Sequence, residues 1–277
     1  MIKNLTLQQA ATAIVAAESI LITAGAGMGV DSGLPDFRGQ QGFWKLHPPY
    51  VAAGLSFSDL ANPIWFQRNP ARAWGFYGYR YQRYQQTNPH PGFAILKRWQ
   101  DNAHQQGFVV TSNVDGQFQK AGFSEERIYE CHGAIRYLQC SASCKNEVWT
   151  DPELSFDIEP QQLLATGNLP RCPHCGELAR PNVLMFGDRN WLSSRSDQQR
   201  QRFYAWKSAM TNKKVVTIEL GAGSSVGGIR CMGASMPGTL IRINPRETQG
   251  PPGTISLAMG ALEALQAIDA VIQNQCA

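Results

Sequence analysis

The sequence has little of several features that mark special classes of protein. Charged residues make up only 17% of the 277 residues, and the net charge is only +4. No block of lysine or arginine occurs, so nothing indicates a nucleic-acid partner. No run approaches the ~18 apolar residues that a transmembrane helix needs. With 43% hydrophobic residues, we expect a folded, soluble globular protein without a membrane partner.

Cysteine is also scarce, and its pattern is informative. Seven cysteines are too few, and odd in number, for a secreted disulfide scaffold. The first residues lack the basic and apolar regions of a signal peptide, so we expect a cytoplasmic protein. Four cysteines form two close pairs, Cys140 with Cys144 and Cys172 with Cys175. Such pairs supply the closed tetrahedral cage of one structural zinc ion, although unrelated buried cysteines would give the same count.

Short apolar runs alternate with helical stretches along the chain. β-Branched runs separated by helices predict an α/β fold, a Rossmann-like parallel sheet with helices on both faces. The predicted helices cover residues 5–18, with Thr6 as N-cap, and 255–272, and the predicted strands cover residues 19–23, 108–111, 215–220 and 240–244.

Two segments break this alternation and are predicted to be insertions. Residues 41–86 are rich in aromatic side chains and predict a helical insertion. Residues 138–180 carry the paired cysteines and predict a zinc ribbon. We expect these two segments to form a small domain. The large, Rossmann-like domain would then be discontinuous, comprising residues 1–40, 87–137 and 181–277.

A glycine-rich segment follows the first predicted strand. Gly25-Ala26-Gly27 suits the approach of a pyrophosphate, because residues without a Cβ leave main-chain N–H groups accessible. The ordinary dinucleotide fingerprint needs a third glycine, which is absent from its usual position, and the glycines alone would also fit a plain turn. The specific part is the run that follows, Asp31-Ser32-Gly33-Leu34-Pro35-Asp36-Phe37-Arg38-Gly39.

Four further motifs accompany this segment. They are Thr111-Ser112-Asn113-Val114-Asp115, His132-Gly133, the two cysteine pairs, and Arg180-Pro181-Asn182-Val183-Leu184-Met185-Phe186-Gly187-Asp188. Together and in this order, the five motifs resemble the signatures of the sirtuins, a family of NAD-dependent protein deacylases. The resemblance extends over nearly the whole chain.

The resemblance implies roles for individual residues. His132, with an ordinary pKa of about 6.5, would act as general base on a ribose hydroxyl of NAD. Asn113 and Asp115 would line the nicotinamide pocket and belong to the catalytic set. The peptide would pair with an extended segment at Val183, Phe186 and Gly187. The implied cofactor contacts are Gly25, Ala26, Gly27, Asp36, Phe37, Arg38, Ser112, Asn113, Asp115, Gly221, Gly223, Ser224 and Asn244.

The implied reaction removes an acyl group from a lysine of a protein or peptide. Its products are the deacylated lysine, nicotinamide and O-acyl-ADP-ribose. NAD and one structural zinc ion are the implied cofactors, and acylated-lysine proteins or peptides are the implied partners. The sequence does not indicate an oligomeric state.

One further motif bears on the acyl group. Tyr77 and Arg80 resemble the Tyr-x-x-Arg pair of sirtuins that remove succinyl and malonyl groups, and Ala61 matches the small residue that widens their acyl pocket. At i and i+3 of a helix the two side chains share a face, where a guanidinium can bind a carboxylate. In the alternative interpretation, they belong to an amphipathic aromatic helix with solvated arginines.

Several positions depart from the family pattern near the cofactor. Ser112 stands where glutamine is usual, and Gly221-Ala222-Gly223 stands where Gly-Thr-Ser is usual. These changes keep two alternatives open. One is an NAD-dependent protein ADP-ribosyltransferase or NAD hydrolase. The other is a non-catalytic NAD or ADP-ribose binding module, against which the intact His132 argues.

Overall fold

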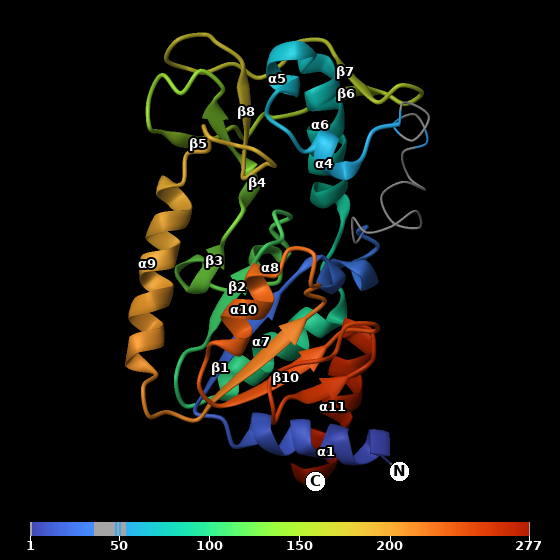
Figure 1. The fold of residues 1–277 in the computed structure, drawn as a ribbon, viewed down its shortest axis with the longest axis vertical. Helices are drawn as coiled ribbons and strands as arrows, with labels where there is room; N and C mark the ends of the chain where they lie inside the picture. Colours follow the sequence, from blue (N-terminus) through green and yellow to red (C-terminus); the bar gives the residue numbers. More distant parts are fainter. Residues whose placement is uncertain (1, 36–47, 49, 51–53, 277) are drawn as a thin grey trace.

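The computed structural model describes residues 2–35, 48, 50 and 54–276. Among these residues, no helix combines the length and apolar character needed to cross a membrane. Figure 1 shows the arrangement of the elements. In chain order they are α1 (Ile2–Val15), β1 (Ser19–Ala24), η1 (Ala26–Ser32), α4 (Phe57–Leu60), α5 (Trp65–Arg68), α6 (Pro70–Gln86), α7 (Pro91–Asn102), β2 (Phe108–Thr111), α8 (Gln117–Lys120), η2 (Glu125–Arg127), β3 (Ile128–Glu130), β4 (Gly133–Cys140), β5 (Val148–Thr150), β6 (Asp157–Glu159), β7 (Leu164–Thr166), β8 (Ala179–Val183), α9 (Ser194–Ala209), β9 (Val215–Leu220), α10 (Gly228–Ala234), β10 (Thr239–Ile243), β11 (Ile255–Leu257) and α11 (Ala261–Cys276).

The main sheet has six parallel strands in the order β11-β10-β9-β1-β2-β3. All residues of β1 and β9 are buried, as expected for central strands covered on both faces. The chain builds the sheet outward from β1 in one direction and then from β9 in the other, which is the doubly wound order of dinucleotide-binding folds. The predicted α/β fold is therefore confirmed.

Helices cover both faces of this sheet. Ala10 of α1, Leu96 of α7 and Leu265 of α11 belong to the apolar core on one face. Phe203 and Trp206 of α9 belong to the core on the other face, together with residues of α10. Figure 1 shows α9 and α11 on opposite sides of the sheet.

A second apolar core lies beyond the main sheet, in the upper half of Figure 1. It joins α4 and α6 with the antiparallel sheet β5-β4-β8 and the hairpin β6-β7. α6 packs tightly there, because a Cβ on Gly75 would lie 1.9 Å from the carbonyl oxygen of Leu163. This core supports our proposed division into a large domain of residues 1–40, 87–137 and 181–277 and a small domain of residues 41–86 and 138–180. Leu34 and Val114 also enter it from the large domain.

Three local predictions were wrong. α1 begins at Ile2, so Thr6 lies inside the helix and not at its N-cap. Residues 255–257, expected to open the last helix, form β11 because Ile255 and Leu257 pair with β10. Phe186 and Gly187 form a turn after β8 and not the expected extended segment. Gly187 has a φ of 68°, and the Asp188 N–H donates to the Met185 carbonyl at 3.3 Å.

Candidate active site and metal centre

A cavity of about 930 Å³ lies between the main sheet and the second apolar core. The segments that follow β1, β2, β3 and β9 all contribute residues to its lining. The chain changes direction between β1 and β9, and the carboxyl ends of strands at such a switch point are where doubly wound folds bind ligands. A neighbouring cavity of about 160 Å³ shares Arg246 and Glu247 with it.

The cavities bring most of the predicted site residues together. The larger one is lined by Gly25, Ala26, Ala61, Tyr77, Arg80, Ser112, Asn113, Asp115, His132, Val183, Phe186 and Gly223. The smaller one is lined by Gly27, Gly221 and Asn244. Ser224 and Gly187 line neither, and Ser225 lines the larger cavity instead. Asp36, Phe37 and Arg38 lie outside the described residues.

The glycines after β1 and β9 pack backbone against backbone. A Cβ on Gly27 would lie 2.6 Å from the Cα of Gly221, and one on Gly25 would lie 2.8 Å from the Cα of Ala222. Gly221 also has a φ of 58°, which disfavours any side chain. The Gly27 N–H donates to the Gly221 carbonyl at 3.1 Å. These glycines therefore let two strand-end loops meet, in addition to any contact with a phosphate.

The segment after β2 places two polar side chains at the cavity. The Asn113 side-chain amide donates to the Gly25 carbonyl at 2.9 Å, which ties this segment to the loop after β1. The Asp115 carboxylate accepts the Gln117 N–H at 2.9 Å. Burial raises the pKa of Asp115 to about 6, with Glu130 adding to the rise and Arg80 opposing it.

His132 lies between β3 and β4, where the chain passes from the main sheet to the second core. Burial lowers its pKa, and a hydrogen bond to the backbone of Ser112 opposes that shift. The His132 carbonyl accepts the Leu184 N–H at 2.9 Å. The imidazole is therefore neutral near pH 7, the form that a general base requires.

Asn244 follows β10 and organises the other end of the site. Its side-chain amide donates to the Ala222 carbonyl at 3.0 Å, and its side-chain oxygen accepts the N–H groups of Arg246 and Glu247 at 2.9 Å. Glu247 in turn accepts the Ser224 N–H at 2.6 Å. No sequence pattern indicated Arg246 and Glu247, because they lie beyond the strand end and reach the cavities through this turn.

The acyl-pocket residues come from the second core. Ala61 ends α4, and its carbonyl accepts the Phe186 N–H at 2.9 Å, so the turn after β8 is fixed to α4. Tyr77 and Arg80 lie on α6, which begins with Asn69 as N-cap. Tyr77 is 0% exposed, yet among the described residues no hydrogen-bond partner contacts its hydroxyl. Buried hydroxyls usually have a partner, so this atom is a candidate contact for a polar ligand group.

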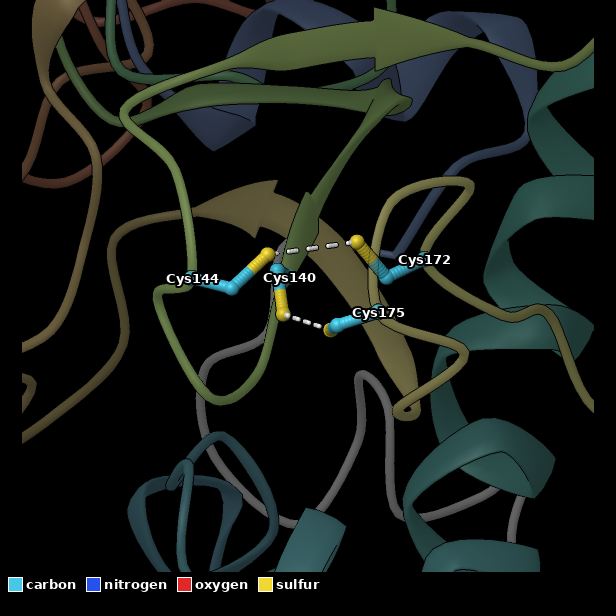
Figure 2. A group of neighbouring side chains, drawn as sticks. All are labelled: Cys140, Cys144, Cys172 and Cys175. Atoms are coloured by element: carbon cyan, nitrogen blue, oxygen red, sulfur yellow. Dashed lines mark hydrogen bonds between the residues drawn. The ribbon is translucent and has the colours of Figure 1, made fainter.

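Figure 2 shows the four paired cysteines, which face one another from the end of β4 and from the loop before β8. All four Sγ atoms lie within 4.8 Å of one another. The Cys140–Cys175 and Cys144–Cys172 pairs are each 3.6 Å apart. A tetrahedral zinc ion with Zn–S bonds of about 2.3 Å requires sulfur separations of about 3.8 Å. The cluster therefore fits one zinc ion with no open coordination position.

Comparison with known proteins agrees with this geometry. The chain is similar to a protein of Aeropyrum pernix described as an NAD-dependent protein deacylase, with 29% identity over 241 residues that cover 86% of each chain. It shares its fold with the solved structure of a Sir2 homologue mutant in complex with ADP-ribose (TM-score 0.70, 23% identity, 97% of both chains). A Sir2 homologue–NAD complex is similarly related (TM-score 0.68, 23% identity, 96% of this chain and 94% of that one).

The family assignment depends on the extent of the match with a family model. The Sir2 family model matches residues 25–215. This range includes the glycine-rich loop after β1, the polar segment after β2, His132 and the cysteine cluster. The chain therefore belongs to the Sir2 family, the sirtuins.

Proposed function

We propose that this chain is an NAD-dependent protein-lysine deacylase that prefers acidic acyl groups such as succinyl and malonyl. The observation that carries the proposal is the composition of one cavity, which holds Asn113, Asp115 and His132 together with Tyr77 and Arg80. The first set suits the reaction at the cofactor. The second suits recognition of an acyl carboxylate.

The residues around the loops after β1 and β9 fit NAD. Gly25 and Gly223 present backbone without side chains to the larger cavity, and Gly27 and Gly221 do so in the smaller one. Asn244 and Glu247 offer polar groups beyond them, which suit ribose hydroxyls. When bound, NAD supplies an activated ribose that accepts the acyl group and releases nicotinamide.

His132 is the proposed general base. Its lowered pKa keeps the ring neutral, so it can accept a proton from a ribose hydroxyl at neutral pH. Asn113 holds the Gly25 carbonyl and thereby fixes the spacing between the loops after β1 and β2.

Tyr77 and Arg80 support the acidic-acyl preference. The Tyr77 hydroxyl is buried without a partner among the described residues, and it can donate a hydrogen bond to a carboxylate. Arg80 lines the same cavity and is only 6% exposed. A guanidinium in such a position binds a planar carboxylate with two parallel hydrogen bonds. Ala61, 5% exposed, leaves room for the longer acyl chain.

The test uses mass spectrometry of the protein with NAD and matched acetyl-, succinyl- and unmodified-lysine peptides. We expect O-acyl-ADP-ribose from both acyl peptides, with faster turnover of the succinyl peptide. Arg80→Met should lower kcat/KM for the succinyl peptide at least about tenfold and leave the acetyl peptide little changed, because a charged hydrogen bond is worth this much. Arg72→Met, on the same helix but outside the cavity lining, is the matched control.

A second candidate function has support from two positions. Ser112 and Ala222 lack the amide and hydroxyl that the family usually places near the cofactor, which favours an ADP-ribosyltransferase or NAD hydrolase. Nicotinamide release without any O-acyl-ADP-ribose would support that function and contradict the deacylase. Equal turnover of both acyl peptides would leave a deacylase without the acidic-acyl preference.

A further inference from the structure

We propose that Tyr84 is a positioning residue for Arg80, so that α6 recognises acidic acyl groups through three side chains, Tyr77, Arg80 and Tyr84. This inference rests on the proposed acidic-acyl preference. Tyr84 lies one turn beyond Arg80 on α6. The sequence motif alone gave no reason to include it.

The geometry places the three side chains on one face. Positions i, i+3 and i+7 of a helix lie one above another, and Tyr77, Arg80 and Tyr84 all line the same cavity. The Tyr84 hydroxyl accepts one hydrogen bond from Arg80 Nε at 3.1 Å and a second from Nη2 at 3.0 Å. Tyr84 is 4% exposed, so water competes little with these bonds.

Aromatic rings complete the support of the guanidinium. The Arg80 Cζ atom lies 5.7 Å from the ring centroid of Phe57, 5.2 Å from that of Phe76 and 5.5 Å from that of Tyr77. The arginine side chain has many rotamers, and a ligand that must order it loses affinity. Because the rings and the Tyr84 hydroxyl hold the guanidinium in advance, the acyl carboxylate meets an ordered binding group.

A tyrosine suits this role better than an acidic residue. Burial raises the pKa of Tyr84, with Arg80 opposing the rise, so the phenol is neutral near pH 7. A neutral hydroxyl accepts the two hydrogen bonds without cancelling the charge of Arg80. A carboxylate in the same place would form an ion pair with Arg80 and compete with the acyl carboxylate.

The backbone at Tyr84 is also anchored. The Lys120 ammonium donates to the carbonyl of Tyr84 at 2.8 Å and to that of Gln85 at 2.6 Å. Lys120 lies on α8, which begins two residues after Asp115. The end of α6 is therefore fixed to the segment that carries the proposed catalytic residues. This contact holds the acyl pocket in a constant position relative to them.

The test is Tyr84→Phe, which removes one oxygen and keeps the ring. Peptide affinity is measured by fluorescence anisotropy without NAD, and kcat/KM is measured with NAD. We expect the Kd of the succinyl-lysine peptide to rise about tenfold and its kcat/KM to fall by a similar factor, with the acetyl peptide little changed. Tyr81→Phe removes the same atom from a residue of α6 that does not line the cavity, and should change neither.

A double-mutant cycle adds a readout that a merely structural role would not change. In an Arg80→Met background, Tyr84→Phe should have no further effect on the succinyl-to-acetyl ratio, because the group that it positions is gone. A wild-type protein without succinyl preference would overturn the proposed function. A wild-type preference that Tyr84→Phe leaves intact, or an equal loss for both peptides, would overturn this inference alone.

Discussion

Burial shifts the titratable groups of the cavity in opposite directions. It raises the pKa of Asp115 to about 6 and lowers the pKa of His132 below its usual range. Both shifts favour the neutral form, because desolvation penalises charge. Around neutral pH the site therefore combines a neutral imidazole with a largely ionised carboxylate.

The pH dependence of deacylation follows from these two shifts. Because the pKa of His132 is lowered, the ring stays neutral as the pH falls from 8 to 7, and kcat/KM should change little in that range. Below about pH 6 it should fall, since Asp115 takes up a proton there, and protonation of His132, whose pKa is lowered from its usual value, adds to the fall. The measurement is kcat/KM for an acetyl-lysine peptide between pH 5 and 9.

Replacement of His132 tests the role of this residue directly. His132→Ala should lower kcat by about 10²- to 10⁴-fold, the usual contribution of a general base. His104→Ala, at an exposed position, should leave kcat unchanged. In the pH profile of the unmodified protein, a loss of kcat/KM on the acid side with its midpoint above pH 7 would contradict the lowered pKa of His132.

At the scale of elements, two strand-end loops define the cofactor end of the site. The loops after β1 and β9 contact each other through Gly25, Gly27 and Gly221. β1 and β9 are adjacent and parallel, so these loops start side by side. The loops can approach this closely because all three residues are glycines, which have no side chain.

Gly221→Ala should separate these loops. The new Cβ would lie 2.3 Å from the Cα of Gly27, on a residue with a φ of 58°. We expect NAD to bind at least about tenfold more weakly in calorimetry and the free energy of unfolding to fall by about 1–3 kcal/mol. Gly253→Ala is the control, because Gly253 also has a positive φ but no atom within 4 Å of its added Cβ. If both variants bound NAD equally well, the loop contact would not matter for the cofactor.

At the scale of the whole molecule, the site lies where two cores meet. The main sheet supplies the loops of the cofactor end, and the second core supplies α6 and the turn after β8. The cysteine cluster belongs to this second part, since it ties the end of β4 to the loop before β8. We therefore expect the position of Val183 and Phe186 in the cavity to depend on the metal. Localisation in the cytoplasm stays a prediction.

Removal of the metal should destabilise the second part of the molecule first. Cys172→Ala or treatment with a zinc chelator should release about one zinc ion per chain and lower the melting temperature, because metal binding is coupled to folding. Deacylation should be lost as β4 and β8 lose their order. Cys231→Ser, outside the cluster, should retain both metal and activity. Full activity of a metal-free protein would contradict a structural role for zinc.

The elements that could be predicted from the amino-acid sequence are those whose signals are local. Buried β-branched runs predicted β1, β2, β9 and most of β10, because a central strand is apolar along its whole length. The spacing of four cysteines predicted the metal centre because each close pair is a local signal, although pairing of β4 with β8 brings the two pairs together. Most of the site residues that the motifs predicted also line the cavities.

Other features depend on partners that are distant in the sequence and become visible only in the folded chain. β11 forms because it pairs in parallel with β10. Its three residues alone carry no pattern that predicts a strand. The turn at Phe186 depends on the Ala61 carbonyl and on Asp188. Tyr84 joins the site because its side chain and that of Arg80 meet in a buried aromatic environment. These contacts are set by packing between the two cores, which no local pattern of residues records.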